Sequence, residues 1–283
     1  MTGTLVLVGT PIGNRGDLSP RARETILGAD LLLCEDTRSV SRLFEPGATL
    51  PPRISCFVGN EAERAGLLRA RLAEGARVVF VSEAGMPTWS DPGATLVRAA
   101  LEGGFSVDVI PGPTAASMAV SLSGFTGSDV HFMGFLPRRG SARASALTQI
   151  ARASATVVLY EAGNRVPALL QELAAIAGDR AMVIARELTK LHQEALRGTA
   201  QALAERVEEA VRGEVTVVIA GRPDAVDDDP GREAARAVWR ALCDETLRPR
   251  ARARAIAERT GLDTREIYEA LGRLASKADE SAD

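Results

Sequence analysis

Residues 78–93 read VVFVSEAGMPTWSDPG, a short apolar run followed by a long connection. The run 78–81 is continuously apolar, which is typical of a strand covered on both faces of a parallel sheet. A plain strand-to-helix connection needs about two to six residues, and 82–93 is about twice as long. Its prolines and glycines hold a defined shape and let backbone approach a ligand. The segment is either an ordered surface loop or a small-molecule cradle made mostly of main chain, and its length and position favour the cradle.

The same strand-then-helix pattern repeats on both sides of this stretch. In the first half, strands are predicted at 5–8, 31–34, 54–57 and 107–110, with helices at 20–27, 61–73 and 91–102. In the second half, strands are predicted at 130–135, 156–160, 182–185 and 215–219, with helices at 141–152, 164–177 and 199–211. Ser19 before Pro20, and Asn60 with Glu63, carry helix-start signals. The alternation predicts an α/β fold with mostly parallel or mixed sheets.

We therefore expect two α/β domains, at 1–115 and 116–222, and a helical tail. Residues 223–230 are acidic and have little to bury, which predicts a linker. Helices are expected near 232–243, 249–259 and 263–275. Gly261 lies between the last two, and Asp263 with Glu266 forms a capping-box pattern. The tail, 231–283, is predicted to be helix-turn-helix-like.

Composition excludes several classes of protein. The chain has 283 residues, of which 46% are hydrophobic and 25% charged, as in globular proteins. The net charge of −3 means that nucleic acid would be bound by a local patch rather than by an overall field. With aromatic residues at 4%, stacking platforms for single-stranded nucleic acid are not expected.

The cysteines and the amino-terminal residues indicate the cellular compartment in which the protein is expected. Cys34, Cys56 and Cys243 are isolated, with no metal-ligand spacing, so we expect reduced thiols and no metal site. No apolar run approaches the roughly 18–20 residues of a membrane span. The start MTGTLVLVGTP lacks the basic region of a signal peptide. A cytoplasmic protein without membrane association is predicted.

Candidate ligand contacts follow from the rule that open α/β sheets bind ligands at the carboxyl ends of their strands. Four such segments are rich in Gly, Pro and polar residues, at 9–16, 35–38, 82–93 and 111–115. The turn 112–114 offers backbone N–H groups at a helix start, suited to an anion, or is only a turn. The segment GTPIGN at 9–14 lacks the GxGxxG spacing, and no phosphate-binding GxxxxGK[ST] element is present.

Charged groups give further candidates, each with a structural alternative. Asp36 and Arg38 could hold a polar substrate or form a structural ion pair. Residues 186–190 follow a predicted strand in the same way, and 137–143 is the most basic short loop, either a solvated turn or a phosphate contact. His131 lies in an apolar strand pattern and is expected to be structural, whereas His192 is expected to be exposed.

Taken together, these segments resemble a known family. The motifs are TPIGN at 10–14, EDTR at 35–38, SEAGMPTWSDPG at 82–93, PGPTA at 111–115, GFLPR at 134–138 and ARELTK at 185–190. In this order they resemble the tetrapyrrole-methylase superfamily of class III methyltransferases. They are most similar to its small-subunit ribosomal RNA 2′-O-ribose cytidine methyltransferases. Where that family has Asp-Ala-Gly-Thr-Pro, this chain has Glu83 and Met86 at the first and fourth positions, and the histidines that tend to precede Asn60 are replaced at 56–59.

The resemblance implies two α/β domains with a cofactor cleft between them, usually in a homodimer. It implies methyl transfer from S-adenosylmethionine to a cytidine 2′-hydroxyl in 16S rRNA of the 30S subunit. The family's cofactor contacts fall on matching positions: Ala84, Gly85, Asp91, Gly112, Pro113, Thr114, Ala115, Tyr160 and Ala185.

The catalytic candidates are two pairs of charged residues. A ribose hydroxyl is a poor nucleophile, so a general base would help. Asp36 oriented by Arg38, or Glu187 with Lys190, is expected to meet the ribose. RNA contacts are expected from Arg38, Arg138, Arg139, Arg186 and Lys190. The alternatives are a methylase of a tetrapyrrole-like macrocycle and a non-catalytic rRNA-binding assembly factor.

Overall fold

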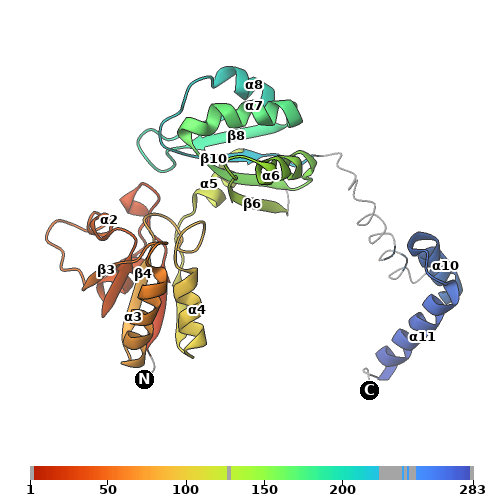
Figure 1. Cartoon of the computed structure of the whole chain (residues 1–283), viewed down its shortest axis with the longest axis horizontal. Coiled ribbons are helices and arrows are strands. Elements are labelled where there is room, and N and C mark those ends of the chain that lie inside the picture. Colours follow the sequence, from red (N-terminus) through yellow and green to blue (C-terminus); the bar gives the residue numbers. More distant parts are fainter. Residues whose placement is uncertain (1–2, 126–128, 223–237, 239–240, 242–246, 281–283) are drawn as a thin grey trace. The chain divides into compact units, whose positions relative to one another are not determined.

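The computed structural model describes residues 3–125, 129–222, 238, 241 and 247–280 (Figure 1). The chain divides into two compact units, Met1–Arg222 and Pro223–Asp283. Each unit is described by itself. None of the described helices combines the length and apolar character that crossing a membrane requires.

The first sheet is entirely parallel, as the alternation of strands and helices predicted. Its strand order is β3-β2-β4-β1-β5, with β1 at Thr4–Val8, β2 at Leu31–Cys34, β3 at Arg53–Ser55, β4 at Arg77–Val81 and β5 at Ser106–Ile110. Because all five strands run the same way, their carboxyl ends meet at one edge. The loops with the first four motifs leave from that edge.

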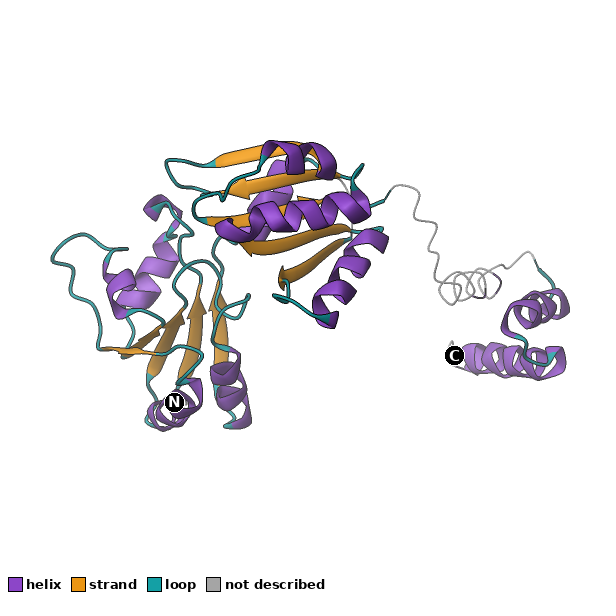
Figure 2. Ribbon diagram, turned by 45° about the horizontal axis from the view of Figure 1, so that its top comes forward, coloured by secondary structure: helices purple, strands orange, loops and turns teal. Residues whose placement is uncertain are grey.

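Helices cover both faces of this sheet (Figures 1 and 2). On one face lie α3 (Glu61–Ala73) and α4 (Ala94–Glu102), and on the other α1 (Pro20–Leu27) and α2 (Thr37–Ser41), after a 3₁₀ turn at Arg15–Asp17. Apolar clusters fill both interfaces. Burial on both faces explains why β1, β2 and β4 are apolar at successive positions rather than at alternate ones.

The helix-start signals have different outcomes. The Ser19 hydroxyl accepts a hydrogen bond from the amide of Ala22 and caps α1, as predicted. The capping box predicted at Asn60 and Glu63 is wrong. The Asn60 side chain instead accepts from the Phe57 amide at 2.8 Å, and Glu63 pairs with Arg64. The Asn60 side chain is engaged by the turn that precedes the helix, so it caps no backbone amide of α3.

The second sheet is mixed. Its order is β6-β7-β10-β8-β9, with β6 at Val130–Phe135, β7 at Thr156–Ala162, β8 at Ala181–Arg186, β9 at Glu194–Thr199 and β10 at Glu214–Ile219. Only β6 and β7 pair in parallel; the other three pairings are antiparallel. Strand β9 was not predicted, because its sequence EALRGT lacks an apolar run. The antiparallel β10 brings its amino end to the edge where β7 and β8 end.

Helices again cover both faces of the second sheet. One face carries α6 (Ser141–Arg152), α7 (Val166–Ala177) and α8 (Ala200–Arg206), preceded in the case of α7 by a 3₁₀ turn at Gly163–Arg165. The opposite face carries α5 (Ala115–Ser123). The last predicted helix of this half ends five residues early, at Arg206 rather than 211. His131, expected to be structural, is exposed on β6.

Cys34 and Cys56 are buried free thiols on and beside the adjacent strands β2 and β3. Burial raises the pKa of each thiol to about 11, so neither is a nucleophile at neutral pH. Cys243 lies outside the described residues.

The second unit contains a helical hairpin. Helix α10 (Pro249–Thr260) ends at Gly261, whose φ of +71° is the left-handed conformation that glycine adopts without strain. Helix α11 (Thr264–Glu280) follows, and the Asp263 carboxylate accepts hydrogen bonds from the amides of Arg265 and Glu266. The hairpin and its Asp263 cap were predicted. The predicted helix at 232–243 lies almost wholly outside the described residues.

Candidate active site

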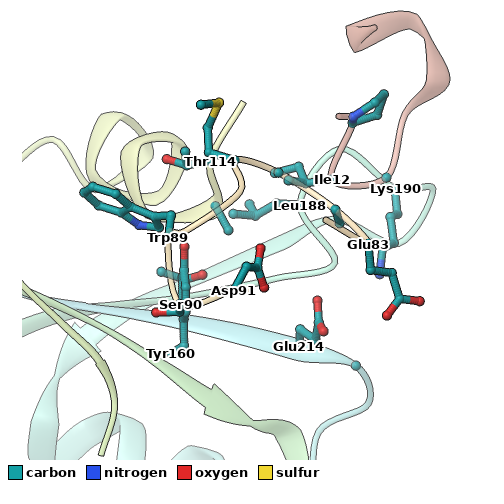
Figure 3. Close-up of a pocket in the computed structure, with 18 of the residues that line it drawn as sticks. Ile12, Glu83, Trp89, Ser90, Asp91, Thr114, Tyr160, Leu188, Lys190 and Glu214 are labelled. Atoms are coloured by element: carbon teal, nitrogen blue, oxygen red, sulfur yellow. The ribbon is translucent and has the colours of Figure 1, made fainter. Parts of the chain in front are cut away.

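A cavity of about 820 Å³ lies among the loops at the strand ends of both sheets (Figure 3). Each of the six motifs contributes at least one residue to its lining. The contributing residues are Pro11, Ile12 and Gly13; Glu35; Glu83, Ala84, Gly85, Met86, Trp89, Ser90 and Asp91; Thr114 and Ala115; Phe135; and Glu187, Leu188 and Lys190. Arg15, Ser39, Arg42, Leu43, Tyr160, Glu161 and residues 213–216 complete the lining.

The TPIGN segment, residues 10–14, connects two other loops. Thr10 and Gly85 exchange backbone hydrogen bonds of 2.8 and 3.0 Å in an isolated antiparallel bridge. Four residues further on, the backbone N–H of Asn14 donates to the Thr189 hydroxyl at 2.9 Å. The segment therefore contacts the 82–93 loop of the first sheet through its first residue and the 187–190 loop of the second sheet through its last.

The ends of β1 and β5 approach each other too closely for side chains. A Cβ atom added at Gly9 would lie 2.6 Å from the Gly112 backbone, and one at Gly112 would lie 2.7 Å from Gly9. The Gly112 amide donates to the Met86 sulfur at 3.2 Å. Met86, where the resembling family has threonine, thus packs over the paired glycines and supplies an acceptor through its thioether.

Backbone strain concentrates in the two loops that TPIGN connects. Among described residues other than glycine, only Thr88, Ser90, Glu187 and Thr189 have positive φ, between +50° and +71°. This conformation is uncommon for any residue with a Cβ and is a true outlier for β-branched threonine. Such strain persists where the surrounding structure over-determines it, and it clusters at functional sites.

The cavity contains a group of carboxylates. Figure 3 shows the side chains of Glu83, Asp91 and Glu214 around the same space. Burial, and then the negative charges of Glu35, Glu214 and Glu83, raise the pKa of Asp91 to about 6, while a hydrogen bond from Ser82 acts to lower it. The carboxylate of Glu35 also accepts from the Glu83 amide at 3.2 Å. This part of the cavity is suited to a cationic ligand.

A second side of the cavity is aromatic. Trp89 stacks on Phe132, with ring centroids 4.9 Å apart, and Tyr160 contacts Phe132 edge-on at 5.0 Å. Burial raises the pKa of Tyr160, while hydrogen bonds from the Ala116 amide and the Trp89 indole to its hydroxyl lower it. Tyr160 also packs against the apolar cluster that contains Ala116 and Ala119 of α5.

The two catalytic candidates lie in different surroundings. Glu187 and Lys190 both line the cavity and form an ion pair of 3.0 Å. Asp36 and Arg38 form an ion pair of 3.1 Å at the start of α2, outside the cavity lining. Hydrogen bonds from Arg38 lower the pKa of Asp36, and the Asp36 carboxylate also caps α2. The geometry gives Asp36 a local structural partner and gives Glu187 access to the cavity.

The arginines proposed to contact RNA also differ. Arg138 and Arg139 are exposed, and neither has a side-chain partner among the described residues. Arg186 forms a 2.6 Å ion pair with Glu194. Arg143 in the same basic loop is buried, and it donates to Glu172 at 2.9 Å and to the Pro137 carbonyl at 2.9 Å.

Most of the expected cofactor contacts line the cavity. They are Ala84, Gly85, Asp91, Thr114, Ala115 and Tyr160. Gly112 and Pro113 lie just behind the lining, with Gly112 bound to Met86 and the Pro113 carbonyl close to Gly85. Ala185 is buried on β8 within the cluster beneath α5.

Sequence reasoning missed several lining residues. Glu214 was missed because the binding rule concerns the carboxyl ends of strands, whereas β10 is antiparallel and meets the site with its amino end. Trp89 was inside the 82–93 loop, and its rarity in this chain was a usable signal. Arg15 and Arg42 lie just outside the TPIGN and EDTR motifs, and only the fold shows that they line the cavity.

The motif-bearing loops, the glycine approach and the cavity between two α/β sheets define a class of protein. Residues 4–204 match the family model described as Tetrapyrrole (Corrin/Porphyrin) Methylases, and the chain belongs to this family of methyltransferases. Within the family, its relatives carry the name "Ribosomal RNA small subunit methyltransferase I". The one from Micromonospora olivasterospora is 42% identical over 98% of this chain and 88% of its own length.

Other relatives of the same name align over part of the chain. The one from Xylella fastidiosa (strain Temecula1) is 41% identical over 62% of this chain and 64% of its own length. The one from Thermotoga maritima is also 41% identical, over 62% of this chain and 79% of its own length.

Solved structures share the fold at lower identity. The methyltransferase CobJ superposes with a TM-score of 0.60 at 19% identity, covering 78% of this chain and 95% of that chain. Uroporphyrin-III C-methyltransferase from Thermus thermophilus, complexed with S-adenosyl homocysteine, gives 0.56 at 20% identity over 80% of this chain and 100% of its own. At these identities the likeness shows the fold alone.

Proposed function

We propose that this protein transfers a methyl group from S-adenosylmethionine to the ribose 2′-hydroxyl of a cytidine in 16S rRNA of the 30S subunit. The observation that carries the proposal is the convergence of all six motifs on one cavity. The name shared by the relatives, at 42% identity over nearly the whole chain, supports rRNA of the small subunit as the substrate. We further propose that it works in the cytoplasm as a homodimer.

The residues of the cavity suit this methyl donor. The donor has a sulfonium and an ammonium group, and carboxylates at Glu83, Asp91 and Glu214 surround the space. The main chain of Ala84 and Gly85 lines the same cavity, in keeping with a cradle made largely of backbone. The donor, when bound, supplies a methyl group that its sulfonium has already activated, so the protein need supply no covalent intermediate.

The chain's own residues have two tasks. They must hold the ribose hydroxyl in line with the methyl–sulfur bond at roughly 3 Å, which is positional catalysis. They must also accept the hydroxyl proton as the new oxygen–carbon bond forms. Glu187 is the better placed of the two acidic candidates, because it lines the cavity and Asp36 does not. Lys190, 3.0 Å from Glu187, would orient that carboxylate.

The reaction is tested by incubating the full chain with donor labelled in its methyl group and with 30S subunits or protein-free 16S rRNA. Nucleoside analysis of the RNA then identifies the modified residue. Label in 2′-O-methylcytidine is the expected result. Label in another nucleoside would refute the position of transfer. Absence of label with donor binding confirmed by calorimetry would favour a macrocycle methylase or a non-catalytic rRNA-binding factor.

The base is tested with Glu187→Gln, with Asp36→Asn as the matched control. Loss of a general base is expected to slow single-turnover methyl transfer by about 10²–10⁴-fold. The control is expected to retain the rate, since Asp36 is paired with Arg38 outside the cavity. A slow Asp36→Asn enzyme with a normal Glu187→Gln enzyme would reverse the assignment.

A further inference from the structure

The aromatic side of the cavity is unusual for this chain. The protein has two tryptophans, two tyrosines and seven phenylalanines in 283 residues. Four of these rings nevertheless gather in one group, made of Trp89 from the 82–93 loop, Phe132 and Phe135 from β6, and Tyr160 from β7. Three of the four line the cavity. The few aromatic residues of the chain are therefore concentrated at this site.

Two of these rings remain partly exposed although each contacts another ring of the group. Trp89 is 44% exposed and Phe135 is 56% exposed. Phe135 is the cross-strand partner of Tyr160, and the two ring centroids lie 5.6 Å apart. A core would bury such rings, because each has a large apolar area to remove from water. Their exposure at a cavity leaves flat faces that a planar ligand can cover.

The backbone around Trp89 is strained in a way that presents the ring. Thr88 and Ser90, its two neighbours, both have positive φ, at +71° and +64°. The indole ring stacks on Phe132, with the two ring centroids 4.9 Å apart. Strain on both sides of one residue and a stacked ring beneath it indicate that the orientation of Trp89 is specified.

Two exposed arginines follow the strand that carries Phe135. Arg138 and Arg139 follow the end of β6, and neither has a side-chain partner within the part of the chain that the structure describes. Their loop is fixed from beneath by Arg143, which donates to the Pro137 carbonyl and to Glu172. Aromatic faces beside free arginines are the combination by which proteins bind unpaired bases and the phosphates next to them.

We propose that Trp89 and Phe135 form a stacking wall for the unpaired base of the RNA nucleotide to be methylated, and that Arg138 and Arg139 bind its adjoining phosphates. This inference rests on the proposed function. The donor also has a nucleobase but no phosphate, so the neighbouring arginines favour the RNA as the occupant. A single-stranded segment, or a nucleotide turned out of a helix, is the form of substrate that this wall accepts.

The test uses steady-state methylation of 30S subunits and calorimetric titration with the donor. Phe135→Leu and Trp89→Leu remove a ring, and Trp89→Phe keeps one. We expect the leucine variants to raise the apparent KM for the subunit between about fivefold and 150-fold, the range for loss of one base stack. Donor affinity is expected to stay within about twofold, and Trp89→Phe to recover most of the loss.

Phe57→Leu is the matched control, because Phe57 is 46% exposed but lies outside the cavity lining. It is expected to leave both constants unchanged. Weaker donor binding with an unchanged KM for the subunit would place the donor's base on the wall and overturn the proposal. Leucine variants that change neither constant would also overturn it. A wild-type enzyme that labels no RNA would instead refute the proposed function, so the two failures are distinguishable.

Discussion

Replacing Asp91 with asparagine should make the protein more stable at neutral and alkaline pH. The native environment raises the pKa of this carboxyl from 3.8 to about 6, chiefly by burial and then by the charges of Glu35, Glu214 and Glu83. The native state therefore holds the proton more tightly than the unfolded chain does. Between about pH 4 and 6 unfolding releases a proton, so ionisation of Asp91 lowers native stability as the pH rises through this window.

The size of the effect follows from the shift. A change from 3.8 to about 6 corresponds to about 3 kcal/mol if the carboxyl were fully shielded. Because the carboxyl borders an open cavity, we discount this to about 1–2 kcal/mol. In a unit of this size each kcal/mol moves the melting temperature by about 2–4 °C. Asp91→Asn should therefore melt about 2–8 °C higher than the wild type at pH 8.

Calorimetric unfolding of both proteins at pH 8, 6 and 4 provides the assay. The stabilisation should shrink as the pH falls through 6 and be lost towards pH 3.8, where Asp91 is protonated in both states. Ser82→Ala is a useful companion, since it removes the hydrogen bond that favours the ionised form. A variant that is no more stable at pH 8, or whose advantage grows in acid, would refute the reasoning.

The same substitution should impair binding of the methyl donor. A carboxylate that destabilises the free protein can still serve function by binding a cationic ligand, because functional sites are often less stable than the rest of a protein. Calorimetry should show weaker binding of S-adenosylmethionine by Asp91→Asn. S-adenosylhomocysteine, which lacks the sulfonium charge, should be affected less. Equal losses for the two ligands would remove Asp91 from recognition of the charge.

Three further changes have clear expected results. Gly85→Ala should cost about 1–2 kcal/mol in urea unfolding, because φ is +77° there. Gly66→Ala, with open space around the added methyl in the middle of α3, should instead gain about 0.5–1 kcal/mol in the same assay, and a loss would contradict the propensity argument. Arg138→Gln with Arg139→Gln should reduce the salt dependence of 30S binding by about one unit of slope for each phosphate that the variant no longer binds, without changing donor affinity; an unaltered slope would exclude both arginines as phosphate ligands.

Much of the fold could be predicted because its causes are local. Continuous apolar runs require a sheet covered on both faces, and Ser19 and Asp263 cap helices through their own side chains. Strand β9 escaped prediction because it is an edge strand with polar and small residues, held by its pairing with β8. The cap expected at Asn60 failed because the local turn at 57–60 engages the same side chain.

The site residues that lie in sequence motifs could be predicted. Those that reach the site only through the topology of the sheets could not. The loop 82–93 could be found from its length alone. Glu214 could not, since its place depends on the direction of β10, and hydropathy does not distinguish a parallel from an antiparallel strand. The same limit applies to the group of four aromatic rings, because Phe135 and Tyr160 become neighbours only through the pairing of β6 with β7.

The TPIGN segment sets a limit on how the length of this chain can vary. Surface loops usually accept insertions at little cost. Here Thr10 must meet Gly85 while Asn14, four residues later, meets Thr189. A residue added or removed between them would change the distance that both connections span. The number of residues from Thr10 to Asn14 is therefore set by the two loops that they join, whichever side chains stand between them.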